Sequence, residues 1–114
     1  MRTYTITTNN RKNKFNDRVS IDDAVPYQFD FTPWQEDFGT ITGVTVTAER
    51  GLVGVTNIEN NNGLVSAVLT FNDQGKALVT FLVVTATAQK KVWLEVYAKD
   101  YENEPDDYGF AEYD

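Results

Sequence analysis

The fold of this chain is decided by one stretch, Tyr27-Gln28-Phe29-Asp30-Phe31-Thr32-Pro33-Trp34. Tyr27, Phe29 and Phe31 alternate with polar residues, so an extended strand here would bury one aromatic face and expose the other to water. Proline cannot donate a hydrogen bond to a neighbouring strand, so Pro33 is expected to end this one. Trp34 is large enough to fill the corner that follows.

A second strand is predicted just downstream, at Thr40-Ile41-Thr42-Gly43-Val44-Thr45-Val46-Thr47, and Gly51-Leu52 closes this region. Its valines alternate with threonines, a pattern typical of a strand with one buried face. Ile41 falls on the opposite parity from Val44, which predicts a β-bulge at Gly43.

Short strands are also expected along the rest of the chain, at about residues 2–8, 19–21, 52–55, 65–71, 77–84 and 92–99. Asn60-Asn61-Asn62-Gly63 predicts a turn, because Asn and Gly tolerate positive φ. The strands at 65–71 and 77–83 are predicted to form a hairpin around Asn72-Asp73-Gln74-Gly75. Phe15, in a polar loop at residues 9–16, is expected to pack onto the body. No window predicts an amphipathic helix, so the pattern favours an all-β fold, a single antiparallel β-sandwich of about seven or eight strands.

The composition excludes several kinds of chemistry. The chain has 114 residues, no cysteine and no histidine, which removes disulfides, thiol nucleophiles, the usual base of a serine triad and nearly all zinc sites. Asp30 and Glu36 or Asp37 could lie near one another at the Trp34 corner, but nothing in the spacing requires it, and a solvated strand face and loop is the better explanation. The Asp-x-Asp-x-Asp-Gly order of a calcium loop is absent. We therefore expect no enzymatic activity, no catalytic or metal residues and no cofactor.

Charge divides the chain into a body, residues 1–99, and an acidic tail, residues 100–114. The net charge is −7; the tail holds seven acidic residues and no basic one, whereas residues 1–18 hold five basic residues and one acidic residue. Acidic and aromatic side chains together suit docking onto a basic, grooved protein surface. The candidate partner-binding residues are Tyr101, Glu102, Glu104, Asp106, Asp107, Tyr108, Phe110 and Tyr113 in the tail, and Arg11, Lys12 and Lys14 near the N-terminus.

Few basic residues on an acidic protein argue against a nucleic-acid partner. No run of about 18 apolar residues predicts a membrane span, and the N-terminus lacks the apolar segment of a signal peptide. The expectation is a soluble protein without a membrane partner.

Together with Asp22-Asp23-Ala24-Val25, residues 27–52 resemble an Ig-like module found in structural proteins of tailed-bacteriophage virions. The resemblance covers roughly residues 22–99. Thr85-Ala86-Thr87-Ala88-Gln89-Lys90-Lys91 departs from it, since relatives carry a Gly-containing stretch and an Asp-Glu-Arg turn there. The resemblance implies an Ig-like sandwich in a virion, assembled in the host cytoplasm as a head-decoration, neck, tail or fibre-associated protein. Its partners would be capsid, neck or tail proteins and further copies of this chain.

The alternative hypothesis is a carbohydrate-binding or adhesion module. Such sandwiches bind surface glycans through exposed aromatic side chains, which here would be Trp34, Trp93 and Tyr97. Burial or edge packing of the same three side chains is the simpler explanation.

Overall fold

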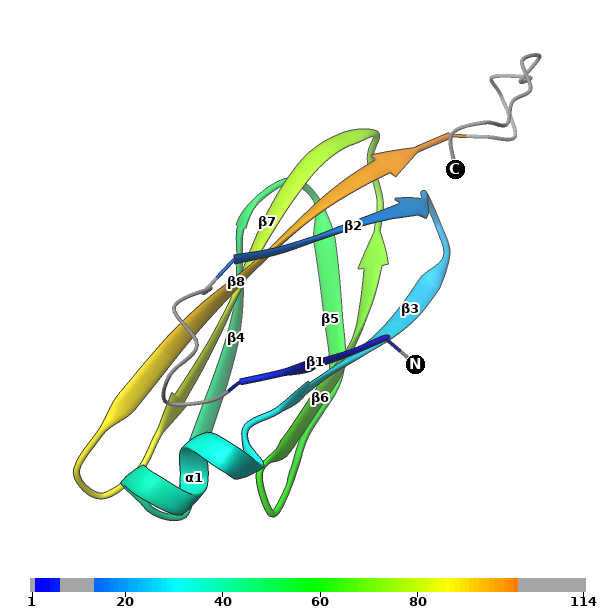
Figure 1. Ribbon diagram of the computed structural model, residues 1–114. Coiled ribbons are helices and arrows are strands. Elements are labelled where there is room, and N and C mark those ends of the chain that lie inside the picture. The colour runs from blue at the N-terminus through cyan, green and yellow to red at the C-terminus, as the bar shows by residue number, and fades with distance from the viewer. Residues whose placement is uncertain (1, 7–13, 101–114) are drawn as a thin grey trace.

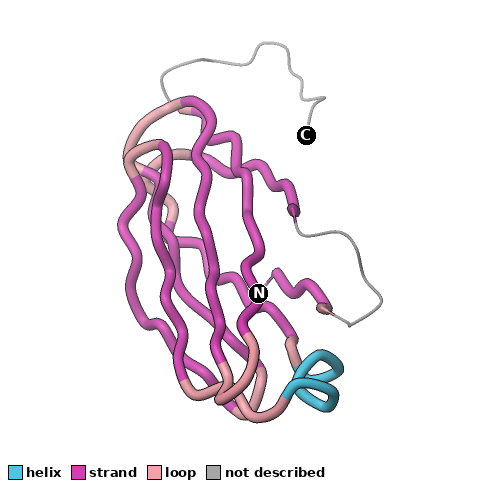
Figure 2. Tube along the Cα trace, turned by 90° about the vertical axis from the view of Figure 1, so that its left-hand side faces the viewer, coloured by secondary structure: helices cyan, strands magenta, loops and turns pink. Residues whose placement is uncertain are grey.

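The structure of this protein is a computed structural model that describes residues 2–6 and 14–100. These residues form eight strands and one short helix, arranged as two four-stranded sheets packed face to face (Figures 1 and 2). The first sheet has the order β1 (Arg2–Thr5), β3 (Ala24–Asp30), β6 (Leu64–Phe71) and β5 (Val53–Asn61). The second sheet has the order β2 (Lys14–Ser20), β8 (Gln89–Lys99), β7 (Gly75–Val84) and β4 (Gly43–Arg50). The all-β prediction is confirmed.

The aromatic strand lies at the centre of the core, as its alternation predicts. Tyr27, Phe29 and Phe31 are fully buried. The Phe29 ring meets Phe81 of β7 at a centroid distance of 4.6 Å, so this pair joins the two sheets. Rings at this distance stabilise a core by about 0.5–1.5 kcal/mol beyond the area they bury.

The corner after β3 is a helix, α1 (Thr32–Phe38), and the prediction that the chain has no helix was wrong. Pro33 lies in the first turn, where its missing N–H costs nothing. Seven residues are too few to reveal a 3.6-residue period, so the sequence pattern does not show this helix. Trp34 is 3% exposed and its ring lies 5.1 Å from that of Phe38, which confirms that it fills the corner.

The sheets are mixed, so the prediction of an entirely antiparallel sandwich was wrong. β1 pairs with β3 and β2 pairs with β8 in parallel, whereas the remaining pairs are antiparallel. β1 and β2 lie at the edges of different sheets. Buried and exposed side chains alternate with a period of two in parallel and antiparallel strands alike. The sequence pattern therefore does not distinguish parallel from antiparallel pairing.

The predicted hairpin of residues 65–71 and 77–83 was also wrong, because β6 and β7 belong to different sheets. Both strands direct their alternate residues into the same core, as predicted: Phe71 and Phe81 are fully buried. Residues 72–74 therefore carry the chain from one sheet to the other. The predicted turn at residues 60–63 does join a hairpin, β5–β6, with Asn62 and Gly63 at φ 52° and 97°. Positive φ at both central residues is the type I′ geometry that suits strand twist.

Two local predictions near the strand ends need correction. Gly43 is the first residue of β4 and pairs regularly with Val84, so the bulge predicted there was wrong; the register of β4 on β7 shifts between Ala48 and Arg50 instead. Ile41 has the opposite parity because it precedes the strand, where it is buried. Phe15 packs onto the core as expected, but it lies within β2 rather than in a loop.

Candidate docking surface

The outward side of the second sheet carries most of the basic side chains found in the described strands. In β8, Val92, Leu94 and Val96 are buried, and the residues between them point away from the core. Pairing places Lys14 and Arg18 of β2 beside Trp93 and Tyr97, respectively. We call the outward side chains of β2, β8, β7 and β4 the outer face.

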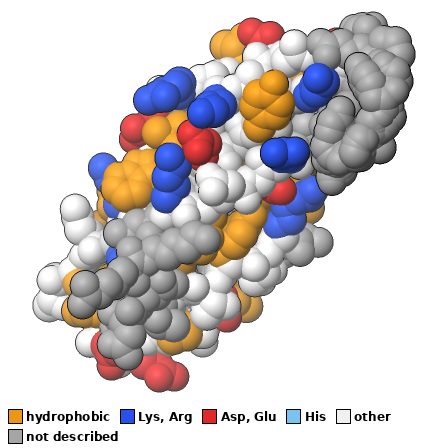
Figure 3. Space-filling view, turned by 45° about the horizontal axis from the view of Figure 1, so that its top comes forward, with side chains coloured by type: hydrophobic (Ala, Val, Ile, Leu, Met, Phe, Trp, Pro, Cys, Tyr) orange, Lys and Arg blue, Asp and Glu red, His pale blue; other side chains and the backbone are white. Residues whose placement is uncertain are grey.

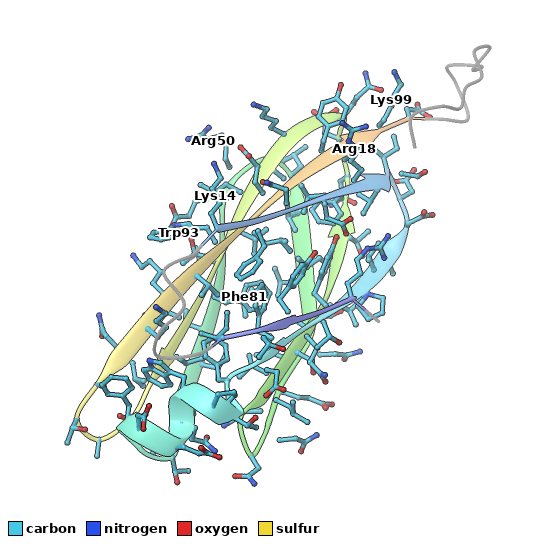
Figure 4. The ribbon with its side chains drawn as sticks, in the orientation of Figure 1. Lys14, Arg18, Arg50, Phe81, Trp93 and Lys99 are labelled. Atoms are coloured by element: carbon cyan, nitrogen blue, oxygen red, sulfur yellow. The ribbon has the colours of Figure 1, made fainter. Side chains whose placement is uncertain are left out.

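Positive charge gathers on the outer face. Its basic residues come from all four strands and are Lys14, Arg18, Arg50, Lys76, Lys91 and Lys99. Its acidic residues are Glu49 and Glu95, so the formal charge is +4. Lys and Arg side chains surround hydrophobic ones on this side of the molecule (Figure 3), and Lys14, Arg50 and Trp93 project away from the core that holds Phe81 (Figure 4). By contrast, the strands of the first sheet contain Arg2 as their one basic residue, with Asp30 and Glu59.

Both acidic residues of the outer face already have partners. Glu95 forms an ion pair with Lys14, with the Lys14 Nζ and the Glu95 Oε1 3.3 Å apart. Glu49 accepts a hydrogen bond of 2.7 Å from the Thr80 hydroxyl. Arg18 and Lys76 form no ion pair with another residue of the described ranges, which leaves their charges available to an incoming anion.

A shallow depression lies at the Tyr97 end of the outer face. It has a volume of about 580 Å³ and is lined by Asn16, Asp17, Arg18, Lys76, Glu95 and Tyr97. The Tyr97 side chain is exposed, at 44%. A guanidinium, an ammonium and an exposed aromatic ring side by side suit a carboxylate next to an aromatic or apolar group.

Lys14 is the one sequence-predicted partner-binding residue within the described ranges, and it lies on the outer face. The other predicted residues lie outside those ranges: Arg11, Lys12, Tyr101, Glu102, Glu104, Asp106, Asp107, Tyr108, Phe110 and Tyr113. Sequence reasoning missed Arg18, Lys76 and Lys91 as site residues, because strands distant in sequence bring them together. The alternation of charged and aromatic residues at 91–99 is the signal that marks this face.

The glycan-binding candidates do not form one platform. Trp34, a residue of α1, has its side chain buried in the core, so burial is the correct explanation for it and its ring offers no surface to a glycan. Trp93 and Tyr97 do share the outward side of β8, but Glu95 lies between them. The Lys91 ammonium lies over the Trp93 ring, 5.9 Å from its centroid, and covers part of that ring.

A second cluster of polar side chains, between the sheets, has a structural role. The Tyr27 hydroxyl donates to Asp17, and Arg2 forms an ion pair with the same carboxylate. Burial, followed by the Asp17 hydrogen bond and charge, raises the pKa of Tyr27 far above its ordinary value of 10.0. Tyr27 therefore stays protonated at neutral pH and cannot act as a base there.

Neither a cluster of possible metal ligands nor a membrane-spanning helix occurs in the described ranges. They contain no group of three or more acidic side chains placed to hold a metal ion. No helix in those ranges is long and apolar enough to cross a membrane.

No family model and no curated protein matches this chain. Among solved structures, it is similar to the cysteine protease inhibitor EhICP2 from Entamoeba histolytica, with a TM-score of 0.54 and 8% sequence identity over 85% of this chain and 95% of the inhibitor. The solution structure of amebosin matches at a TM-score of 0.36 and 10% identity, over 87% of this chain and 99% of that one. At these identities the likeness to the inhibitor concerns the fold alone.

Proposed function

We propose that this protein is a non-enzymatic structural component of a tailed-phage virion, an Ig-like β-sandwich that binds neighbouring virion proteins through its charged surfaces and ends. The observation that carries the proposal is the outer face, where six basic side chains and two acidic ones surround Trp93 and Tyr97. The sequence resemblance to phage Ig-like modules supplies the virion context, and its most distinctive part, residues 27–34, forms the end of β3 and the start of α1.

The chemistry of the side chains supports a role without catalysis. The chain has neither histidine nor cysteine. Asp30, a carboxylate considered for acid–base work, accepts hydrogen bonds from the Thr32 backbone N–H at 2.9 Å and the Thr32 hydroxyl at 2.7 Å. These bonds fix the start of α1, so the Asp30 carboxylate has a structural role.

The proposal is tested by quantitative mass spectrometry of purified particles from the phage that encodes the chain. We expect the chain to co-purify with the particles in a fixed ratio to the major capsid protein, after a high-salt wash that removes adsorbed protein. If the chain is abundant in the lysate yet absent from washed particles, the virion role is wrong. The ratio also separates a shell decoration, present in many copies, from a neck or tail part.

Tyr97 favours a second candidate function, glycan binding, because its ring is exposed beside Arg18 and Lys76. A fluorescence titration of the Trp34→Phe variant against a glycan panel reports on Trp93 alone, since the chain has two tryptophans. A saturable change that Tyr97→Ala abolishes would support glycan binding. No response to any glycan would exclude it for this face.

A further inference from the structure

We propose that the outer face is the docking surface for residues 101–114 of a second copy of this chain. This inference rests on the proposed function, since it names the partner of the same surface. It makes the contact between copies head to tail: the acidic end of one chain meets the basic face of the next.

Charge complementarity is the first argument. Residues 101–114 contain six acidic residues and no basic one, and the outer face carries a formal charge of +4. Arg18 and Lys76 make no ion pair with another described residue, so a carboxylate approaching them displaces water rather than an existing partner. Exposed ion pairs contribute about 0–1 kcal/mol each, so charge mainly steers the encounter and sets its direction.

Aromatic complementarity is the second argument. Residues 101–114 include Tyr101, Tyr108, Phe110 and Tyr113 among their acids. The depression beside Tyr97 is open, and two cations, Arg18 and Lys76, form part of its lining. Its two carboxylates, Asp17 and Glu95, are already ion-paired with Arg2 and Lys14. Asp106-Asp107-Tyr108 places an aromatic ring beside carboxylates. Such a pair fits the Arg18 side chain, because a guanidinium can stack on a ring and pair with an anion at the same time.

The position where β8 ends favours docking of residues 101–114 on the outer face of another copy over docking on the outer face of the same molecule. β8 ends at Lys99, and the backbone N–H of Asp100 donates to the Gln74 side chain at 3.0 Å, which holds the chain to the sheet up to that point. The β8 arrow ends at one end of the sandwich, so residue 101 starts from that end and not from the middle of the outer face (Figure 1). Fourteen residues span at most about 50 Å when extended, enough to reach a neighbouring molecule. Because every copy has the same end and the same face, such contacts produce rings or open arrays.

The test is sedimentation velocity of the full chain over a range of concentrations, at low and high salt. We expect the sedimentation coefficient to rise with concentration at low salt and the association to weaken at high salt. Arg18→Ala/Lys76→Ala should weaken association by roughly tenfold, the effect of losing two surface ion pairs. Thr3→Glu/Thr56→Glu changes the net charge by the same −2 on exposed positions of the first sheet and should leave association unchanged.

Mixing two variants identifies which chain supplies each half of the contact. One variant carries Arg18→Ala/Lys76→Ala; the other carries Glu102→Gln/Glu104→Gln/Asp106→Asn/Asp107→Asn. Each alone should associate poorly. The mixture should form a heterodimer, because one wild-type end can still meet one wild-type face. A full chain that stays monomeric throughout, or a mixture no better than its parts, would overturn the inference.

The two proposals fail separately. A chain that is present in washed particles but monomeric in solution refutes this contact and leaves the virion role standing. A chain that associates as expected but is absent from particles refutes the virion role alone.

Discussion

The Tyr27 hydroxyl in β3 donates a hydrogen bond of 2.7 Å to the Asp17 carboxylate in β2, and this bond links the two sheets. Arg2 of β1 pairs with the same carboxylate, and its guanidinium lies 5.8 Å from the centroid of the Tyr27 ring. Strands from both sheets therefore meet at one polar cluster, on the side of the sandwich where β1 and β2 form the edges.

Removing this bond should destabilise the protein without changing its fold. Tyr27→Phe keeps the buried ring but leaves Asp17 without its hydroxyl donor, so we expect the free energy of unfolding to fall by about 1–2 kcal/mol. Urea unfolding measures the change. Tyr4→Phe is the matched control, since Tyr4 stacks on Phe29 at 5.2 Å and its pKa responds to the same Asp17 charge. An equal loss in both variants would show that the Tyr27 hydrogen bond has no special weight.

Stability should fall at alkaline pH because of the same cluster. Burial is the main cause that raises the pKa of both Tyr4 and Tyr27 above 10.0 in the folded protein. Below pH 10 both states hold these protons, so the stabilisation is fully present. As pH rises further, the unfolded chain loses protons that the folded chain keeps, and the free energy of unfolding falls by up to about 1.4 kcal/mol per pH unit for Tyr27, with a smaller contribution from the more exposed Tyr4.

The Tyr27→Phe variant tests this cause. Urea unfolding at a series of pH values gives the slope of the unfolding free energy against pH. Above pH 10 this slope should be shallower in the variant than in the wild type, because the variant lacks the contribution of Tyr27. A slope identical to that of the wild type would contradict the assignment.

Close approach of the backbone at Gly51 should make it intolerant of a side chain. A Cβ there would lie 2.8 Å from the Ala77 Cβ and 3.0 Å from its Cα, and Gly51 has a φ of 91°. Gly75 also has a positive φ, 126°, but a Cβ there meets nothing within 4 Å. We therefore expect Gly51→Ala to lower the unfolding free energy by about 1–3 kcal/mol more than Gly75→Ala, because overpacking adds to backbone strain. Thermal unfolding of both variants measures the difference, and equal losses would show that the close contact is relieved without cost.

The two tryptophans should report opposite environments. Trp34 is 3% exposed, whereas Trp93 lies on the outer face among basic side chains. Iodide, an anionic quencher, should therefore quench the Trp34→Phe variant strongly and the Trp93→Phe variant weakly. Acrylamide, which is neutral, serves as the control for charge. Similar iodide quenching in both variants would contradict the burial of Trp34.

How far the sequence determines this structure depends on the kind of feature. The alternation of apolar and polar residues predicts the buried side of a strand correctly, as Tyr27 and Phe29 show. It does so because successive side chains of a strand point to opposite faces of the sheet. It does not predict which strands become neighbours: β6 and β7 follow each other in sequence yet lie in different sheets. It also misses α1, where Trp34 was identified as the corner residue but seven residues carry no visible helical period.

The candidate site was predictable only in part. Lys14 was selected from the basic N-terminal segment and lies on the outer face. Arg18 and Lys76 were not selected, because they flank Tyr97 only through the parallel pairing of β2 with β8 and the antiparallel pairing of β7 with β8. Pairing between distant strands is set by the whole core, so a local pattern does not reveal such a surface.

We propose that this chain joins a virion through its charged surfaces and ends, with the acidic residues 101–114 making a required contact. The most direct measurement is its occupancy on assembled particles, determined by quantitative mass spectrometry for the full chain and for a chain ending at Asp100. We predict that the full chain fills its sites and that the shortened chain, matched in folding by its thermal unfolding, is largely lost from washed particles. Undiminished occupancy of the shortened chain would contradict the claim.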